Sequence, residues 1–424
     1  MSTDTFLARY LIETPLPPEQ VAEVIAGEQS CGTFTRVAGE TEELRMRARA
    51  TVERVQSLES VTRPSLSNAL LERRGTSGPY QRALVDIRFP IANIGANLPT
   101  LAACVTGNLF DLGEVTGLRL ESLELPASYR RQFDMPTCGI AGTRSRTGVV
   151  RNAMVGTIIK PSVGLRTEDV VQLVQTLCDA GVDFIKDDEV CADPAHSPLH
   201  ERIPAVMEVI RAHEERSGKH VMFAFNITDE TDAMKRHADL VEREGGSCVM
   251  VSQNWVGYSA LQTLRRHTGL ALHAHRNGYG ALSRHPLLGI SVSAYQTLWR
   301  LAGADHIHVH GLQGKFAQAD QEVREAIGHC LHRLDDQHDD RVLPVVSSGQ
   351  WAGTVETTWQ AANSTDVLFM AGGGILAHPA GAHAGVLSLQ QAWQAAVQGI
   401  SVHEQAKTCD ELAQALAFFG PKMA

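Results

Sequence analysis

The densest group of residue types that could do chemistry is Lys186, Asp188 and Glu189, in the segment D-F-I-K-D-D-E (183–189). If a β-strand ends here, alternation places Lys186 and Asp188 on one face, and Glu189 can join them beyond the strand. A lysine beside two carboxylates can simply form a salt bridge. Alternatively, a lysine kept neutral by burial can react with CO₂, and the carbamate oxygens would complete a Mg²⁺ site with both carboxylates.

Histidines form a second group, as two H-x-H pairs at His273/His275 and His306/His308. Histidines at positions i and i+2 on an inward face can be satisfied polar groups of a core, or zinc ligands. A zinc-dependent hydrolase barrel normally carries its H-x-H pair on the first strand, where this chain has Lys160. The zinc interpretation is therefore the weaker one, although it stays open.

Short apolar runs alternate with amphipathic segments from about residue 154 onward, and this pattern predicts parallel strands joined by helical crossovers. Eight such units over about 240 residues favour a closed (β/α)₈ barrel, in which chemistry sits at the C-terminal ends of the strands. A further helical pattern, Val402–Phe418, is expected to pack outside the barrel. The expected strands cover 154–160, 182–186, 221–227, 248–252, 270–275, 306–310, 343–348 and 367–372.

The N-terminal part of the chain mixes helix and strand patterns and predicts a smaller α+β domain. We therefore expect two domains, an α+β domain over residues 1–135 and a TIM-barrel catalytic domain over residues 136–424. The clearest N-terminal elements are helices at Pro18–Gly27 and Leu98–Gly107 and a strand at Tyr80–Phe89.

Composition limits the classes of function. The net charge of −10 disfavours a nucleic-acid or anionic-membrane partner, but it permits an anionic small substrate because only local charge matters in a pocket. We see neither an apolar run long enough to span a membrane nor a secretory signal at the N-terminus. Eight scattered cysteines without a C-x-x-C pair are typical of reduced thiols, so we expect a cytoplasmic protein.

Several motifs resemble those of one known family, the RuBisCO large chain. The segments G-T-I-I-K-P-S-V-G-L (156–165) and D-F-I-K-D-D-E (183–189) are similar to the two central motifs of that family. The similarity continues in order along the whole chain. The further matching segments are E-Q-S-C-G-T-F (28–34), G-N-L-F (107–110), L-H-A-H-R (272–276), D-H-I-H (305–308), G-K (314–315), P-V-V-S-S-G (344–349) and A-G-G-G-I-L-A-H-P (371–379).

The resemblance implies specific roles at the ends of the barrel strands. Lys186 would be the carbamylated lysine, and with Asp188 and Glu189 it would hold Mg²⁺. Lys160 would transfer the carbon-bound proton, and His275 would handle protons of substrate hydroxyl groups. The expected cofactors are therefore Mg²⁺ and CO₂, the latter as a carbamate.

The resemblance also implies how the substrate is bound. Lys315 matches a lysine of the mobile sixth loop that faces a carboxylate in carboxylating members. Glu28, Thr33 and Asn108 would complete the site of a partner subunit, so the implied unit is a homodimer with a shared active site. One phosphate or polar end of the substrate would meet Arg276, His308 and Ser347, and the other would meet Thr33, Gly349, Gly372 and Gly373.

Departures from the carboxylase pattern concentrate around the substrate. They stand at Phe34, Ser162, Tyr279, His310, Gly311 and Ser348. Ser348 replaces a glycine where backbone must approach an anion closely. The chain therefore resembles the RuBisCO-like (form IV) proteins, which do not fix CO₂. We expect a monophosphorylated substrate whose phosphate lies at Gly372–Gly374.

An enediolate is reached either by proton abstraction or by loss of CO₂ from a β-keto acid. Lys315 favours the second route, because a loop lysine can face a departing carboxylate. We therefore expect decarboxylation of a 3-oxo sugar-acid phosphate of the 3-oxo-isoapionate 4-phosphate type, as in members of apiose catabolism. The alternative is an enolase or isomerase of a methylthio-sugar phosphate from methionine salvage. A regulatory metabolite-binding protein would not need the intact metal and proton-handling residues.

Overall fold

The structure is a computed structural model that describes residues 4–32 and 37–423. The chain forms two compact units. The first unit comprises Met1–Asp134 together with Gly278–Leu301, and the second, the barrel unit, comprises Met135–Asn277 together with Ala302–Ala424.

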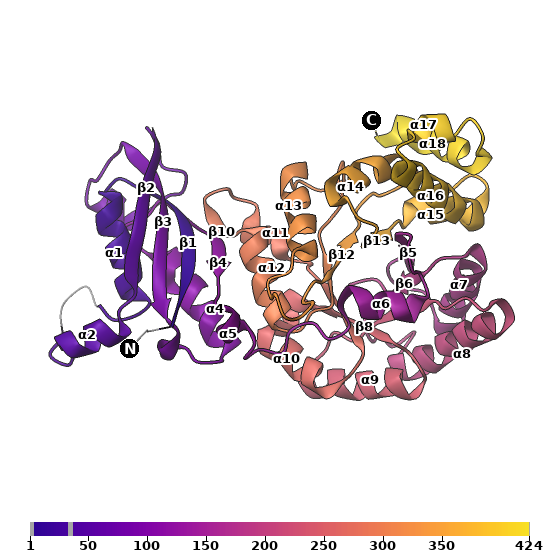
Figure 1. The fold of residues 1–424 in the computed structure, drawn as a ribbon, viewed down its shortest axis with the longest axis horizontal. Helices are drawn as coiled ribbons and strands as arrows, with labels where there is room; N and C mark the ends of the chain where they lie inside the picture. Colours follow the sequence, from indigo (N-terminus) through magenta and orange to yellow (C-terminus); the bar gives the residue numbers. More distant parts are fainter. Residues whose placement is uncertain (1–3, 33–36, 424) are drawn as a thin grey trace. The chain divides into compact units, whose positions relative to one another are not determined.

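The first unit is built on a five-stranded sheet with the order β10-β4-β1-β3-β2, all of whose strands are labelled in Figure 1. Strand β1 pairs antiparallel with β3 and β4, β2 pairs antiparallel with β3, and the short β10 pairs parallel with β4. The strands are β1 (Thr5–Thr14), β2 (Thr51–Val61), β3 (Tyr80–Pro90), β4 (Gly117–Glu124) and β10 (Leu288–Ile290).

Helices complete the first unit, and α1 packs on β2 and β3. The expected helices and strand of this unit are confirmed, because α1, α4 and β3 occupy the residues that the pattern indicated. The helices are α1 (Pro18–Glu28), α2 (Glu42–Ala48), α3 (Ala69–Arg73), η1 (Ile91–Asn93), α4 (Leu98–Thr106), η2 (Asn108–Asp111), α5 (Ala127–Arg130), α11 (Tyr279–Ser283) and α12 (Val292–Leu301).

The segment Gly278–Leu301 lies within the range expected for the barrel domain, but it packs in the first unit. Its strand β10 extends the sheet beside β4, and Ser291 fixes this join with a hydroxyl that donates to the Glu121 carbonyl. A strand of three residues has no periodicity that the sequence could reveal, so only the pairing identifies it.

The barrel unit is a closed parallel barrel with the order β11-β12-β13-β5-β6-β7-β8-β9. Each strand lies within one of the eight predicted apolar runs, so the (β/α)₈ prediction is confirmed. Both faces of these strands are covered, which explains why they are continuously apolar rather than alternating. The strands are β5 (Met154–Ile158), β6 (Phe184–Lys186), β7 (Met222–Asn226), β8 (Cys248–Ser252), β9 (Ala271–His275), β11 (His306–His308), β12 (Leu343–Val346) and β13 (Leu368–Met370).

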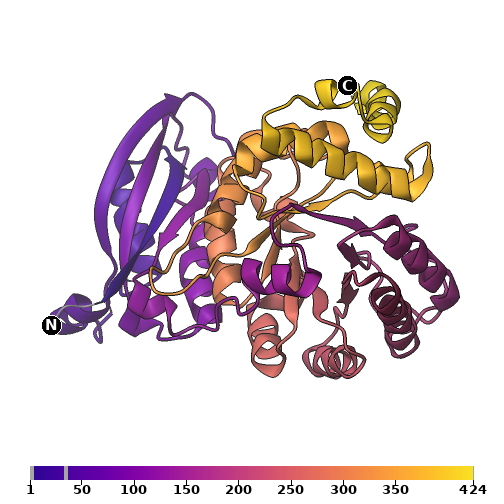
Figure 2. The same cartoon turned by 45° about the vertical axis from the view of Figure 1, so that its right-hand side comes forward.

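Helices surround the barrel strands, as Figure 2 shows for the barrel unit. The expected single helix over Val402–Phe418 is instead two helices. The chain turns at residues 406–408 and a new helix begins at Asp410 and Glu411, acids favoured in a first turn. The helices are α6 (Gly139–Thr147), α7 (Thr167–Ala180), α8 (Leu199–Ser217), α9 (Thr231–Arg243), α10 (Gln253–His267), α13 (Asp320–Leu331), η3 (Ala352–Thr354), α14 (Val355–Ala362), α15 (Gly373–Leu376), α16 (Gly381–Gln398), α17 (Val402–Gln405) and α18 (Asp410–Met423).

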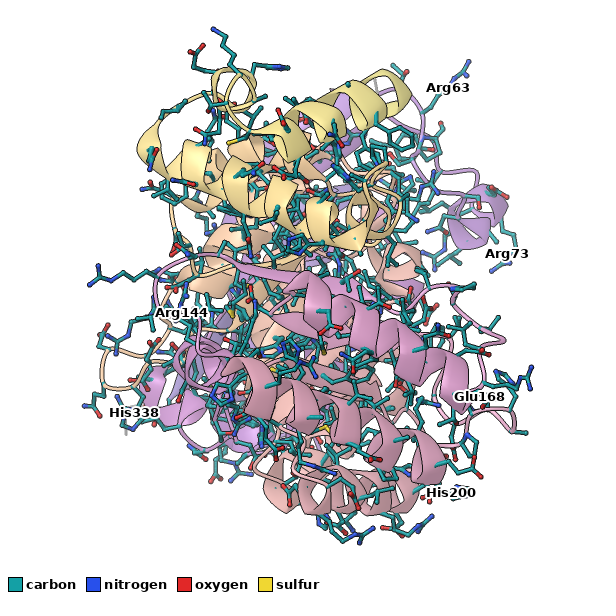
Figure 3. The ribbon with its side chains drawn as sticks, turned by 90° about the vertical axis from the view of Figure 1, so that its right-hand side faces the viewer. Arg63, Arg73, Arg144, Glu168, His200 and His338 are labelled. Carbon is teal, nitrogen blue, oxygen red and sulfur yellow. The ribbon has the colours of Figure 1, made fainter. Side chains whose placement is uncertain are left out.

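The barrel unit has a mouth, where the strands end, and a floor, where they begin. Glu168 and His200, in the first turns of α7 and α8, lie on one side of the unit, and Arg144 and His338 lie on the other (Figure 3). Arg144 belongs to the floor, where its Nε atom lies 2.8 Å from Asp366 Oδ1 just before β13. Glu168 and His200 therefore mark the side of the mouth, because α7 and α8 follow the ends of β5 and β6. The parallel strands direct their C-terminal residues to this side.

A buried carboxylate organises the floor. Asp305 Oδ1 accepts the backbone N–H groups of residues 137–139, at the start of α6. Its Oδ2 atom accepts from Arg265 Nη1 at 2.8 Å and from the Leu272 N–H. These bonds fix α6 across the floor beside β9 and β11.

Over the described ranges 4–32 and 37–423, no helix combines the length and apolar character that a bilayer span requires.

Candidate active site

Lys186 ends β6 and is buried, with 1% of its surface exposed. Its Nζ atom donates to the Asp187 carbonyl at 3.0 Å and lies 3.2 Å from Glu189 Oε2. Burial lowers the pKa of Lys186, although the nearby carboxylates of Glu189 and Asp188 oppose this shift. Burial therefore acts in the direction of the neutral amine, the form that can react with CO₂.

Asp187 points to the opposite side of the strand. Its Oδ2 atom accepts from Arg202 Nη2 at 3.2 Å and from the Asn226 N–H at 3.0 Å. Burial raises its pKa, and the Arg202 charge works against that shift. Asp187 thus joins α8 to the barrel, which leaves Asp188 and Glu189 for the mouth.

Asp188 is buried at the mouth and contacts the lysine that follows β5. Lys160 Nζ lies 2.6 Å from Asp188 Oδ2 and 2.7 Å from Ser162 Oγ, and 44% of the Lys160 side chain is exposed. Asn226 Nδ2 donates to the Asp188 carbonyl at 3.0 Å and so fixes the backbone at this point. The adjacent strands β5 and β6 therefore place the expected proton-transferring lysine directly on an expected metal ligand.

Glu189 meets His275 at the end of β9. His275 Nε2 lies 3.5 Å from Glu189 Oε2, while its Nδ1 atom accepts the Asn277 N–H at 3.3 Å. Burial alone would raise the pKa of Glu189, but the nearby Lys186 charge and hydrogen bonds outweigh burial and lower that pKa to about 2. Burial, with Lys186 nearby, lowers the pKa of His275 to about 4. Glu189 is therefore an anion at neutral pH, and His275 is neutral with its proton on Nε2.

These residues offer a third protein oxygen to a metal ion only if Lys186 is modified. Within residues 4–32 and 37–423, no group of three or more His, Cys, Asp or Glu side chains is arranged to hold a metal ion. Asp188 and Glu189 supply two oxygen donors beside the buried Lys186 amine. A carbamate on this amine would add the third oxygen, and an all-oxygen set suits Mg²⁺. The donor set therefore fits the magnesium site that the sequence predicts.

The other histidines of the H-x-H pairs contact each other in the barrel core. His273 lies between His306, with 3.2 Å between their Nδ1 atoms, and His308, with 2.7 Å between their Nε2 atoms. The remaining nitrogens contact Thr143 Oγ1 at 2.7 Å and Ser347 Oγ at 3.2 Å. All six ring nitrogens of these three histidines therefore have partners. This is what we expect if the histidines are satisfied polar groups of the core.

The loop between β11 and α13, residues 309–319, carries Lys315. This side chain is exposed, with Nζ 5.2 Å from the centre of the Phe316 ring. The buried Gln350 holds the stem of the loop, since its Nε2 atom donates to the carbonyls of Leu312 at 3.2 Å and Ser348 at 3.4 Å. Gln318, also in this loop, accepts a hydrogen bond from Arg276. Neither glutamine is predicted from the sequence, because neither belongs to a motif.

The residues that the sequence predicts to bind an anion through their backbone lie at the ends of β12 and β13. Ser348 and Gly349 both have left-handed backbone angles, with φ of 76° and 80°. Gly373 faces open space, whereas a Cβ on Gly374 would lie 2.6 Å from the Gln350 carbonyl oxygen. Gly374 therefore permits α15 to pack closely on the loop that follows β12. Gly372 precedes α15 at its N-terminal cap.

The remaining predicted residues belong to the first unit or are not described. Glu28 ends α1 and Asn108 begins η2; both are exposed, and these two elements pack against each other. Thr33 and Phe34 lie outside the described residues. Tyr279 is buried in the first unit, where its hydroxyl donates to the Ile290 carbonyl at 3.0 Å. Its observed role is therefore to hold α11 against β10.

Comparisons with known proteins agree with the motifs. Residues 139–419 match the family model "Ribulose bisphosphate carboxylase large chain, catalytic domain", and residues 2–129 match the model of its N-terminal domain. The crystal structure of a RuBisCO-like protein from Burkholderia fungorum is 61% identical and superposes with a TM-score of 0.94, covering 98% of this chain and 100% of that one.

Two named relatives are similar over nearly their whole length. A 3-oxo-isoapionate-4-phosphate transcarboxylase/hydrolase of Xanthobacter autotrophicus is 45% identical, over 97% of this chain and 98% of the relative. A 3-oxo-isoapionate-4-phosphate decarboxylase of Rhizobium rhizogenes is 42% identical, over 97% of each chain. The prediction of family and enzyme class is thereby confirmed: the chain belongs to the ribulose bisphosphate carboxylase large chain family and is one of its RuBisCO-like enzymes.

Proposed function

We propose that this enzyme decarboxylates a phosphorylated 3-oxo sugar acid of the 3-oxo-isoapionate 4-phosphate type. The observation that carries the proposal is the buried Lys186 beside Asp188 and Glu189, with Lys160 Nζ 2.6 Å from Asp188 Oδ2. This contact supports Lys160 as an acid–base group beside the proposed Mg²⁺ site. The relatives named for 3-oxo-isoapionate 4-phosphate support the choice of substrate.

The proposed cofactors are Mg²⁺ and CO₂. The metal would be held by a carbamate on Lys186 and by the carboxylates of Asp188 and Glu189. When bound, it would supply positive charge that stabilises the oxygens of an enediolate. Lys186 would take up CO₂ while its amine is neutral, a form that its burial favours.

The chain's own residues account for the movement of the proton and of the carboxylate. As the bond to the carboxyl group breaks, its electron pair passes to the ketone side of the substrate and CO₂ departs. The Lys160 ammonium would then deliver a proton to the carbon that carried the carboxyl group. Lys315, on the loop before α13, would face the departing carboxylate, and the Nε2–H of His275 would donate to a substrate oxygen.

Binding of the substrate would use both ends of the site. We place its phosphate on the backbone N–H groups of Gly349, Gly372 and Gly373, because N–H groups in left-handed turns and at helix starts attract anions. The other end would meet Arg276, with His308 and Ser347 behind it. A homodimer is part of the proposal, because Glu28 and Asn108 are exposed in the first unit and would complete a partner subunit's site together with Thr33.

A cytoplasmic location is also part of the proposal. All eight cysteines are free, Cys31, Cys104, Cys191 and Cys409 being partly exposed and the others buried. Free thiols at partly exposed positions suit a reducing compartment.

A second candidate is transfer of the carboxyl group followed by hydrolysis, as in the name of the 45% identical relative. The third is an enolase or isomerase reaction on a methylthio-sugar phosphate, for which Lys160 would abstract rather than deliver a proton. These reactions differ in the fate of the carboxyl carbon. That carbon is therefore the atom to follow.

The deciding experiment uses 3-oxo-isoapionate 4-phosphate labelled with ¹³C in its carboxyl group, in D₂O with Mg²⁺ and unlabelled bicarbonate. Decarboxylation releases labelled CO₂ and leaves deuterium on the carbon that carried it. Label retained in a non-volatile acid would indicate the transcarboxylase/hydrolase reaction. The absence of turnover, with deuterium exchange into a methylthio-ribulose phosphate, would indicate the enolase or isomerase branch.

A further inference from the structure

Five side chains form a buried hydrogen-bonded chain from the floor of the barrel to its mouth. Thr143 stands on α6, and the chain continues through His306, His273 and His308 to Ser347, just beyond β12. The successive contacts are 2.7 Å, 3.2 Å, 2.7 Å and 3.2 Å. Each of the five residues is at most 7% exposed. Water therefore has little access, and each contact must contain one proton from the side chains themselves.

The position of the first proton follows from Thr143. Its Oγ1 atom lies 2.6 Å from the Gly139 carbonyl oxygen. Two oxygens this close repel each other unless a proton lies between them, and only the hydroxyl can supply one. Thr143 therefore donates to Gly139, and it can only accept from His306. His306 must carry its proton on Nε2.

The remaining protons follow because a neutral imidazole carries one N–H. Burial lowers the pKa of His306 to about 4 and the pKa values of His273 and His308 well below their ordinary value. Nδ1 of His306 is then an acceptor, so His273 donates from Nδ1. Nε2 of His273 is in turn an acceptor, so His308 donates from Nε2. The Nδ1 atom of His308 is left to accept the hydroxyl proton of Ser347.

We propose that Thr143 sets the direction of this chain and that His306 and His273 are positioning residues for Ser347. With its proton directed at His308, Ser347 offers only lone pairs to the mouth of the barrel. An anionic phosphate oxygen has no proton and is repelled by such a group, whereas a hydroxyl donates to it. Ser347 therefore selects a hydroxyl group of the substrate.

This selection rests on the proposed function and deepens it. It assigns a hydroxyl group to the end of the substrate that meets Ser347 and leaves the phosphate for Gly349, Gly372 and Gly373. Both ring nitrogens of His308 are engaged within the chain, so His308 acts on the substrate through Ser347. A bisphosphate would thus place an anionic group against an acceptor.

The direction depends on the hydroxyl of Thr143. If a valine replaced it, His306 would no longer have an acceptor for its Nε2 proton. Each imidazole could then take the opposite tautomer, and His308 would donate to Ser347. The Ser347 hydroxyl would turn its proton to the mouth, and the preference for a substrate hydroxyl would be lost.

The tautomers can be measured directly by ¹⁵N NMR on the full-length protein labelled in its histidines. We expect Nε2–H on His306 and His308 and Nδ1–H on His273 at neutral pH. Thr143→Ser should preserve this pattern, and Thr143→Val should reverse or mix it while the far-ultraviolet circular dichroism stays unchanged. An Nε2–H on His273 in the wild-type protein, or a wild-type pattern in Thr143→Val, would overturn the proposal.

A kinetic comparison tests the consequence. Replacing the terminal substrate hydroxyl with fluorine keeps an acceptor but removes the donor, and should lower kcat/KM about tenfold in the wild type and in Thr143→Ser. In Thr143→Val the loss should shrink to about threefold or less. If kcat/KM falls equally in all three proteins, Ser347 does not accept a hydrogen bond from a substrate hydroxyl. If the proposed substrate is not turned over at all, the proposed function fails, whereas the NMR pattern still decides the direction of the chain.

Discussion

Lys160 Nζ and Asp188 Oδ2 lie 2.6 Å apart, so the expected proton-transferring lysine is bonded to an expected ligand of Mg²⁺. One oxygen cannot serve both groups fully. Metal binding at Asp188 would weaken this ion pair and free the exposed Lys160 ammonium to turn toward a substrate. Under the proposed function, this pair would make the availability of the Lys160 proton depend on metal binding at Asp188.

Replacing Lys160 should separate these two roles. In Lys160→Met, Asp188 loses its bound cation, so we expect Mg²⁺ to bind at least as tightly as in the wild type. Loss of a positioned acid should lower kcat about 10²- to 10⁴-fold. Calorimetric titration with Mg²⁺ and bicarbonate, together with turnover, tests both effects. Lys407→Met, at an exposed lysine paired with Glu404, is the matched control. Weaker Mg²⁺ binding in Lys160→Met would contradict the coupling.

Replacing Lys186 should abolish metal binding without unfolding the barrel. In Lys186→Met an apolar side chain of similar length occupies a site that is 1% exposed, so the fold should persist. The carbamate signal expected from ¹³C-bicarbonate should disappear, and with it Mg²⁺ binding and turnover. Persistence of tight Mg²⁺ binding in this variant would show that the two carboxylates suffice without a carbamate.

Ser348 stores backbone strain. Its φ of 76° lies in the left-handed region, which is unfavourable for most residues other than glycine and asparagine. We expect Ser348→Gly to raise the free energy of unfolding by about 0.5–1 kcal/mol, after allowing for the greater flexibility of glycine in the unfolded chain. Urea denaturation measures this gain.

Asn363 provides a comparison for that measurement. It also has a positive φ, 45°, at the end of α14, but asparagine tolerates this conformation. Asn363→Gly should therefore gain less stability than Ser348→Gly. If both substitutions destabilise the protein equally, the strain at Ser348 is not released by removing its side chain.

Glu13 should make folding of the first unit sensitive to acid. Its carboxylate is buried in β1 and accepts from Ser65, Thr116 and Arg82. Burial alone would raise its pKa, but these hydrogen bonds outweigh burial and hold the pKa below its usual value. A lowered pKa stabilises the fold above the unfolded-state value of about 4.3, and this stabilisation is lost as pH falls further.

We therefore expect Glu13→Gln to lower the free energy of unfolding by about 1–3 kcal/mol at pH 7. The difference from the wild type should shrink as the pH falls from about 5 to about 3, because the wild-type carboxylate then gains a proton. Glu59→Gln, at the exposed carboxylate that shares Arg82, should change stability little and serves as control. A difference that grows on acidification would contradict this assignment.

Gln350 should hold the stem of the loop that carries Lys315. In Gln350→Leu the carbonyls of Leu312 and Ser348 lose their donor, so amide hydrogens of residues 309–319 should exchange about tenfold faster. Gln391→Leu removes a comparable side chain that bonds Glu411, away from this loop, and is the matched control. Unchanged exchange in Gln350→Leu would show that other contacts fix the stem.

Much of this protein could be predicted from the sequence because the signals are local. Continuous apolar runs mark the barrel strands, since strands covered on both faces are apolar throughout. The C-terminal end of each run points to the mouth, so the order of the runs is enough to place Lys160, Lys186 and His275 there. The motifs around them indicate the family, which the comparisons confirm.

The tertiary structure alone decides what these side chains bond to. Thr143 and His306 are 163 residues apart in the chain, and no periodicity predicts their 2.7 Å contact. The strand β10 is identified only by its pairing with β4, and Gln350 only by the carbonyls it reaches. Local patterns determine where strands end, because an apolar run and the residues that end it are neighbours in the sequence. The direction of a hydrogen bond depends on atoms that only folding brings together.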